Sequence, residues 1–228
     1  MKKYIQSFRL FFGSAQIRSL VIYSAVIIGV TTLCGLTAFF PVNDFLIGFG
    51  QGVSSMLGAI CAIFGLIFLN ATYQYLSPAI PGHKYFASLP DGAKHFRRAI
   101  AVGNAVGIVV GLALISLISI VYALLGVDMG IVLFSSALLF VETGVCDLTG
   151  YIRNNTARVL AILGVTCLFG FFMGFTDGMN EADGISAAQM CMNNPVMTAS
   201  VIGVSAAVFI AGLIYSLAMA EKKWGESR

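Results

Sequence analysis

Charge is scarce in this chain. Only 10% of its 228 residues are charged, whereas a soluble domain carries about 25%. A nucleic-acid-binding surface needs a dense basic stripe, and the thirteen lysines and arginines are instead divided among apolar runs. Together with a mean hydropathy of +0.92, this scarcity excludes a soluble domain and predicts a protein of the lipid bilayer with no nucleic-acid partner.

Sequence motifs for catalysis are also missing. No G-x-x-x-x-G-K-[ST] stretch occurs, so this chain cannot cradle ATP with a P-loop. Neither an H-E-x-x-H zinc motif nor a G-x-S-x-G nucleophile turn is present. The five cysteines include no C-x-x-C pair, and neither histidine is spaced from a cysteine as a metal site requires. We therefore expect no enzyme activity, cofactor or metal in this chain.

Long apolar runs fill most of the sequence. Each is close to or above the ~20 residues with which a helix crosses the hydrocarbon layer. The six runs are 20–40, 45–69, 99–125, 129–148, 159–175 and 196–220. They leave no room for a separate soluble domain. We predict an all-α polytopic membrane protein in which residues 1–228 form a single domain of six transmembrane helices.

Every lysine and arginine falls on one side of these crossings. Four precede the first run, four lie between the second and third, two lie between the fourth and fifth, and three follow the sixth. The other connections hold only acidic charges: Asp44, Asp128, Asp177, Glu181 and Asp183. Because positive charge is retained in the cytoplasm, this distribution predicts that both termini are cytoplasmic.

Three segments outside the crossings have a distinct character. In residues 1–13, aromatic and aliphatic side chains recur at helical spacing opposite lysines and arginines, which predicts an amphipathic helix on the inner membrane surface. This helix could serve as an anchor or contact a partner. Residues 70–98 form the longest cytoplasmic loop. Residues 176–195 form an outer loop, in which we expect a short helix within 184–192.

Polar side chains inside the crossings are few. Glu142 is the only acidic residue deep in a crossing, and Asn104 lies at a matching depth, so we expect a hydrogen bond between them. Glu142 then acts either as a structural pin or as part of a polar, proton-coupled cavity. Asp147 lies nearer the cytoplasm, and we expect it to pair with Arg153 or Arg158.

Small residues recur at every fourth position in two of the crossings. They are Gly103, Gly107 and Gly111 in the third crossing, and Gly170 and Gly174 in the fifth. Helices in lipid associate through close backbone approach, so these stripes predict tight packing. The contact could lie within one chain or between two copies.

Three of these features together resemble the permease subunit of ABC-2-type ATP-binding-cassette exporters. They are the basic amphipathic helix at 1–12, six crossings with both termini inside, and the cytoplasmic stretch Phe86-Ala87-Ser88-Leu89-Pro90 leading to Lys94. In size the chain is similar to small bacterial half-transporters, including those that export amphipathic peptide toxins.

The resemblance implies a function as the membrane part of an ATP-driven exporter. It implies a multi-pass protein of the bacterial cytoplasmic membrane, paired with a second copy and with separate ATPase subunits that hold ATP and Mg. The cargo would be hydrophobic or amphipathic, such as a peptide or lipid. The ATPase-coupling residues that it implies are Phe86, Ser88, Leu89, Pro90, Asp91, Lys94 and His95.

Two other function classes fit the same sequence. One is a six-helix secondary transporter or channel, which inverted repeats would favour, although the halves 1–114 and 115–228 show no convincing self-similarity. The other is a membrane scaffold or immunity protein that transports nothing. A P-loop ATPase that associates with this chain would separate the exporter from both.

Overall fold

The computed structural model describes residues 2–37, 72–76, 85, 88–125, 130–152, 154–180 and 192–226. Within these ranges the regular elements are helices and no strand occurs, which confirms the predicted all-α class for this part of the chain. The helices are α1 (Lys2–Phe11), α2 (Ser14–Thr37), α5 (Gly92–Leu125), α6 (Gly130–Thr149), α7 (Asn155–Asn180) and α9 (Pro195–Glu226). The predicted crossing 45–69 lies outside the described residues, as does the predicted outer helix within 184–192 except for its last residue.

Three of the described helices are long and apolar enough to cross a membrane. The qualifying stretches are Gly92–Val121, Val132–Thr149 and Pro195–Glu226, and shorter apolar stretches occupy Ile17–Leu33 and Thr156–Leu168. Only 17% of the apolar window in α9 is buried within the chain. So much exposed apolar surface is unusual for a soluble monomer and is compatible with insertion into lipid.

Two of these helices begin at asparagine caps. The Asn154 side-chain oxygen accepts hydrogen bonds from the backbone N–H groups of Thr156 and Ala157, at 3.0 and 3.3 Å. Asn194 does the same for Val196 and Met197 at the start of α9, at 3.0 and 3.3 Å. Such caps satisfy N–H groups that lack a partner within the helix. This is why α7 begins before the apolar run that predicts it.

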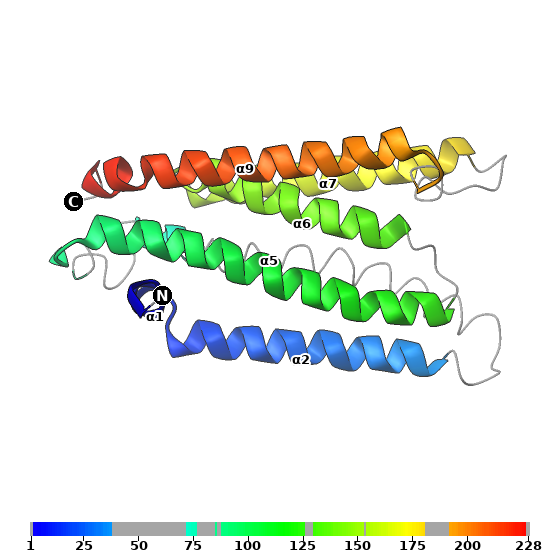
Figure 1. Ribbon diagram of the computed structural model, residues 1–228, viewed down its shortest axis with the longest axis horizontal. Coiled ribbons are helices and arrows are strands. Elements are labelled where there is room, and N and C mark those ends of the chain that lie inside the picture. The colour runs from blue at the N-terminus through cyan, green and yellow to red at the C-terminus, as the bar shows by residue number, and fades with distance from the viewer. Residues whose placement is uncertain are drawn as a thin grey trace.

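The long helices run side by side, and α1 lies across them (Figure 1). Helix α6 packs against α9, α5 and α7, while α5 also contacts α9, α2 and α1. Figure 1 shows α1, the start of α5 and the end of α9 at the same end of the bundle. We call this the shared end.

Two apolar clusters hold the helices together. The first lies at the shared end and is aromatic, with Phe11, Phe12, Tyr73, Phe96 and Trp224 all at most 2% exposed. The second lies further along the bundle and joins α2, α5 and α6 through Ile27, Leu114, Ile115, Ile118, Leu138 and Leu139. The aromatic cluster therefore fixes the positions of α1, α5 and α9 relative to one another.

A close backbone approach between α6 and α9 involves glycines outside the predicted stripes. A Cβ atom added at Gly144 would lie 2.6 Å from the Val208 carbonyl oxygen, and one added at Gly212 would meet the Gly144 backbone. In the predicted α5 stripe, Gly103, Gly107 and Gly111 are buried, and a Cβ at Gly111 would lie 2.7 Å from Leu139 Cδ2. Gly170 and Gly174 lie in α7, where their surroundings are not described.

Candidate functional site

The turn that leads into α5 contains four of the predicted coupling residues, whereas Lys94 and His95 lie at the start of α5 itself. Ser88 Oγ donates to the Tyr85 carbonyl at 2.8 Å, and the Gly92 N–H donates to the Leu89 carbonyl at 3.1 Å. Ser88, Pro90 and Asp91 are exposed and Leu89 is half-buried, while Phe86 lies outside the described residues. The turn therefore presents a small surface at the shared end.

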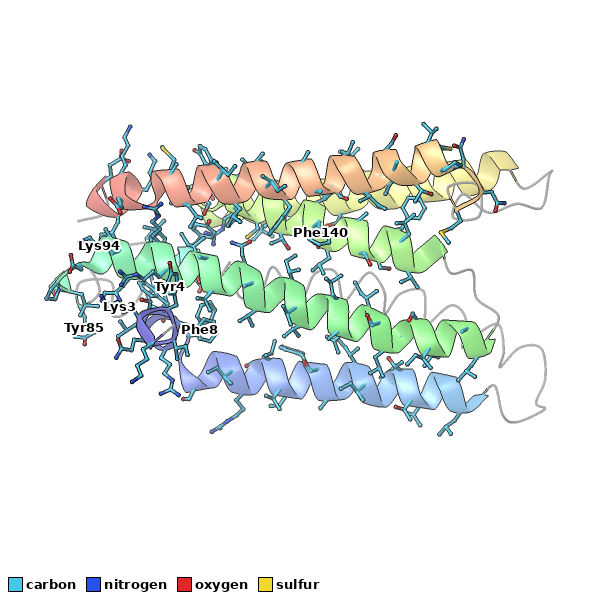
Figure 2. All side chains as sticks on the ribbon, in the orientation of Figure 1. Lys3, Tyr4, Phe8, Tyr85, Lys94 and Phe140 are labelled. Atoms are coloured by element: carbon cyan, nitrogen blue, oxygen red, sulfur yellow. The ribbon has the colours of Figure 1, made fainter. Side chains whose placement is uncertain are left out.

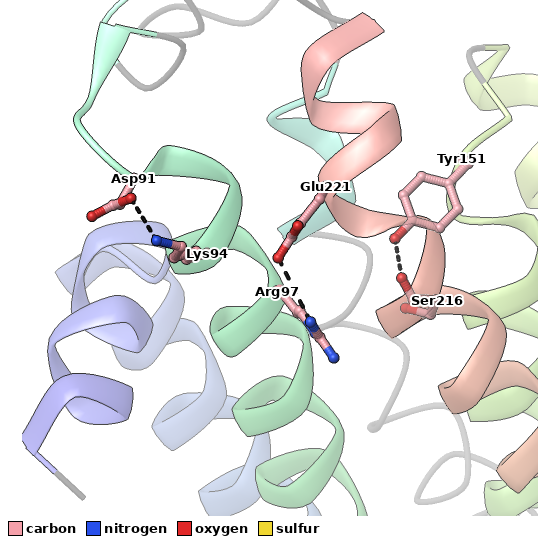
Figure 3. A network of polar contacts seen from close by, with 6 residues as sticks. All are labelled: Asp91, Lys94, Arg97, Tyr151, Ser216 and Glu221. Atoms are coloured by element: carbon pink, nitrogen blue, oxygen red, sulfur yellow. Dashed lines mark hydrogen bonds and ion pairs between the residues drawn. The ribbon is translucent and has the colours of Figure 1, made fainter.

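Asp91 joins this turn to the helix. Its φ angle of 55° lies in the left-handed region, where short polar side chains are better tolerated than larger ones. The Asp91 carbonyl accepts from the His95 N–H at 3.0 Å, and its carboxylate lies 3.0 Å from Lys94 Nζ (Figure 3). The hydrogen bond from Lys94 Nζ and the positive charge of Lys94 lower the pKa of Asp91, so the carboxylate is ionised at neutral pH.

Helix α1 is attached to the first turns of α5. Ser7 Oγ donates to the Lys3 carbonyl at 2.8 Å and lies 2.9 Å from His95 Nδ1. In the tautomer with its proton on Nδ1, His95 donates to the Ser7 hydroxyl oxygen, whose own proton goes to Lys3. The Arg98 guanidinium lies 5.9 Å from the centre of the Tyr4 ring. Figure 2 shows Tyr4 and Lys94 at this end of the molecule.

Aromatic contacts extend this attachment to α9. The Phe11 ring lies 5.7 Å from Phe96 on α5 and 6.0 Å from Trp224 on α9, and the Phe96 and Trp224 rings stack at 5.1 Å. The turn, α1, the start of α5 and the end of α9 thus form one packed unit.

A buried polar cluster lies next to this unit. Tyr73 Oη donates to Asp147 Oδ1 at 2.7 Å, and Asn104 Nδ2 donates to the same oxygen at 3.3 Å. Tyr73 Oη also lies 2.5 Å from Ser216 Oγ, which is the donor in that contact because the single Tyr73 proton already serves Asp147. Burial, and then the charge of Asp147, raise the pKa of Tyr73 well above its ordinary value, so its hydroxyl remains a donor.

Tyr151 ties the same cluster to the backbone of α9. Its hydroxyl donates to the Ser216 carbonyl at 2.5 Å (Figure 3), and burial raises the pKa of Tyr151 above its ordinary value. The Tyr73 ring lies 5.3 Å from Tyr151, and a Cβ at Gly150 would lie 2.6 Å from Tyr73 ring atoms. The cluster therefore joins the segment at 72–76 to α5, α6 and α9.

Two hydrogen bonds reach Asp147 from residues other than the arginines expected from the sequence, and pairing with Arg153 stays a prediction. The two bonds come from Tyr73 and Asn104, whereas Arg158 Nη1 donates to the Gly150 carbonyl at 3.4 Å. Arg153 lies outside the described residues. Sequence reasoning missed Tyr73 and Ser216. Tyr73 lies in a connection, and a single serine within an apolar run carries no signal of its own.

The predicted hydrogen bond between Glu142 and Asn104 is wrong. Glu142 is fully buried, and its Oε1 accepts from Thr166 of α7 at 2.5 Å. Asn104 instead contacts Asp147, five residues further along α6. At 3.6 residues per turn, five residues rotate a side chain by roughly 140°, so the two acids lie on different faces of α6. A matching depth in the membrane was therefore insufficient to predict the hydrogen bond, because the rotation of each helix about its axis decides which side chains meet.

A hollow with basic walls opens between α1, α5 and α9 at the shared end. Its volume is about 390 Å³, and its lining residues are Tyr4, Lys94, Arg97, Arg98, Ala101, Leu217 and Glu221. Arg97 Nη1 lies 3.6 Å from Glu221 Oε1, and each of these two side chains is 54% exposed (Figure 3). Three cations and one anion therefore face this space.

Metal chemistry finds no support in the described part of the chain. Within those ranges, no group of three or more His, Cys, Asp or Glu side chains could hold a metal ion. No protein-family model, curated protein or solved structure matches this chain.

Proposed function

We propose that this chain is the membrane-spanning permease subunit of an ATP-driven ABC exporter. In this proposal six helices cross the bacterial cytoplasmic membrane, with both termini in the cytoplasm. Two copies form the path for a hydrophobic or amphipathic cargo, and separate ATPase subunits bind ATP and Mg. The long apolar helices and the layout of the chain support the membrane placement.

The connection between the exposed turn and α5 supports the proposal independently of composition. The exposed turn at Ser88–Asp91 continues directly into α5, which runs without interruption from Gly92 to Leu125. At 1.5 Å per residue such a helix is about 50 Å long, enough to cover the whole hydrocarbon layer. A displacement of the turn would therefore move the whole of α5, which in this proposal spans the membrane.

The packing around α5 suggests how such a displacement would reach the neighbouring helices. Helix α1 is held to α5 by the Ser7–His95 contact and by Phe11, and α9 is held to α5 by the stacking of Trp224 on Phe96. Close-packed side chains transmit displacement because they have little free volume. In our proposal, an ATPase that pushes on the turn moves α1, α5 and α9 together.

Site-directed photo-crosslinking in native membranes tests this contact. A photoreactive amino acid at exposed Ser88 should crosslink a P-loop ATPase, identified by mass spectrometry. The same group at exposed Ser200, near the opposite end of α9, is the matched control and should not. Recovery of no ATPase at Ser88, from a chain that inserts normally, would contradict the exporter and favour a secondary transporter or scaffold.

Substitution of the turn provides a second measurement. Leu89→Glu places a charge on a half-buried position of the proposed contact and should abolish co-purification of the ATPase while membrane insertion remains intact. Gln6→Glu adds the same charge at an exposed position of α1 and should leave co-purification unchanged. Equal recovery of ATPase with both variants would show that this turn is not the coupling element.

Topology is tested separately with an impermeant thiol reagent. Cysteine at Asn180, in a background with Cys191→Ser, should react from outside the cell, and cysteine at Lys94 should react only after the membrane is opened. Reaction of Lys94 from outside would reverse the proposed orientation.

A further inference from the structure

We infer that the hollow between α1, α5 and α9 is a binding site for the phosphate headgroup of an anionic phospholipid. Its volume of about 390 Å³ falls within the roughly 300–1,000 Å³ typical of small-molecule sites. This inference rests on the membrane placement in the proposed function, but it does not depend on an ATPase.

The charge in the walls favours an anion. Lys94, Arg97 and Arg98 face the hollow against the single carboxylate of Glu221, which leaves a formal charge of +2. Exposed Asp91, which pairs with Lys94 outside the lining, lowers that to +1. A planar guanidinium can offer several N–H donors to phosphate oxygens, so the two arginines suit a phosphodiester better than a simple cation would.

The existing ion pairs do not close the site. Lys94 and Asp91 side chains are 59% and 63% exposed, and Arg97 meets Glu221 only at 3.6 Å with both side chains 54% exposed. Exposed pairs of this kind contribute little to stability. A phosphate that enters the hollow can therefore replace a weak contact with a stronger charge-assisted hydrogen bond.

The order of residues along the helices favours a lipid over free phosphate. On α5 the lining changes from Lys94, Arg97 and Arg98 to Ala101 toward the middle of the bundle, and on α9 it changes from Glu221 to Leu217. A charged rim that passes into apolar walls matches a headgroup followed by acyl chains. Inorganic phosphate has no apolar group that could contact these walls.

The position of α1 supports the same occupant. This helix lies across the bundle at the shared end (Figure 1), with Lys2 and Lys3 exposed and Tyr4 and Ile5 each 48% exposed. A basic amphipathic helix of this kind lies at the level of the lipid headgroups. Tyr4 belongs both to that helix and to the lining, so the hollow opens where anionic headgroups are found.

Native mass spectrometry of the purified full-length chain measures binding directly. The probes are phosphatidylglycerol, phosphatidylcholine and inorganic phosphate. We expect retention of phosphatidylglycerol in preference to phosphatidylcholine, with no competition from inorganic phosphate at equal concentration. Equal retention of both lipids, or displacement by inorganic phosphate, would overturn the inference of an anionic-lipid site.

Charge variants locate the binding. A basic side chain near anionic lipid contributes about 1 kcal/mol, so Arg97→Gln and Lys94→Gln should each weaken binding about fivefold. Glu221→Gln removes the competing anion and should strengthen binding by a similar factor, a gain that misfolding cannot mimic. Lys222→Gln is the matched control, because Lys222 is exposed at the same end but does not line the hollow. Equal weakening by Lys222→Gln would show general surface attraction and overturn the site.

Insertion is measured first, in nanodiscs of phosphatidylcholine alone. Failure to insert would contradict the membrane placement and hence the proposed function. Insertion without any preference for phosphatidylglycerol would contradict only the headgroup site.

Discussion

The contact between α6 and α9 at Gly144 and Gly212 leads to the sharpest stability prediction. A Cβ at Gly144 would lie 2.6 Å from the Val208 carbonyl oxygen and 2.8 Å from Phe209 Cα, whereas ordinary contacts lie at 3.4–4 Å. A Cβ at Gly212 would meet the Gly144 backbone in the same way. Backbone atoms cannot rotate aside as a side chain can. Either substitution to alanine therefore forces the helices apart by about 1 Å, which forfeits dispersion contacts along the whole interface.

The size of the effect follows from two opposing contributions. Overpacking of this kind costs about 1–3 kcal/mol, and the better helix propensity of alanine returns about 0.5–1 kcal/mol. The two contributions together predict that Gly212→Ala lowers the free energy of unfolding by about 0–2.5 kcal/mol, with a midpoint of ~1 kcal/mol. Gly203→Ala in the same helix is the control, because nothing lies within 4 Å of a Cβ there. It should be neutral or slightly stabilising.

A double-mutant cycle tests the mechanism. Gly144→Ala and Gly212→Ala strain the same contact, so once one has separated the helices the second should cost less than it does alone. Unfolding of the purified chain in mixed micelles, with increasing denaturing detergent and helicity followed by circular dichroism, gives all the free energies required. Equal stability of Gly212→Ala and Gly203→Ala, or strictly additive losses in the double variant, would refute the reasoning.

Substitutions at three other positions give defined outcomes. Phe11→Ala truncates a buried aromatic side chain and should lower the free energy of unfolding by about 3 kcal/mol. It also uncovers Trp224, the only tryptophan of the chain, so the fluorescence emission of Trp224 should move to longer wavelength. Tyr73→Phe removes the donor to buried Asp147 and should lower the free energy of unfolding by about 1–3 kcal/mol in the micelle assay. Glu142→Gln should leave the melting temperature nearly unchanged, because an amide oxygen can still accept from α7, whereas Glu142→Leu should cost about 0.6–2 kcal/mol.

Each of these predictions has a control or a contradicting result. Ile5→Ala truncates a half-exposed residue of α1 and should leave the Trp224 emission unchanged. Full stability of Tyr73→Phe would show that the polar cluster does not hold the segment at 72–76. A stable Glu142→Gln variant that loses transport would identify Glu142 as a functional charge rather than a structural pin.

The helices themselves were largely predictable. Runs of apolar residues at 99–125, 129–148 and 196–220 correspond to α5, α6 and α9, because hydropathy alone selects helices in a solvent that cannot satisfy backbone groups. The boundaries were less accurate. Helix α9 continues to Glu226 through charged residues, which have good helix propensity but do not register as apolar.

The candidate site was predictable only in part. The turn before α5 and the amphipathic α1 could be located from local signals, namely Pro90, Asp91 and the spacing of aromatic residues. The contact between Ser7 of α1 and His95 of α5 could not be predicted, because the two residues are separated by 88 residues in the chain and their contact depends on how α1 is rotated on α5.

The sequence by itself determined the scarcity of charge and the all-helical class of the described residues. These are properties of composition and local periodicity. The one-sided distribution of lysine and arginine, which follows from six crossings, stays a prediction. Only the tertiary structure decided which residues meet: Glu142 with Thr166, Asn104 with Asp147, and Gly144 with Gly212. Depth in a membrane is encoded by position along the chain, whereas the partner at that depth depends on how each helix is rotated about its axis. That rotation follows from packing across all of its neighbours at once.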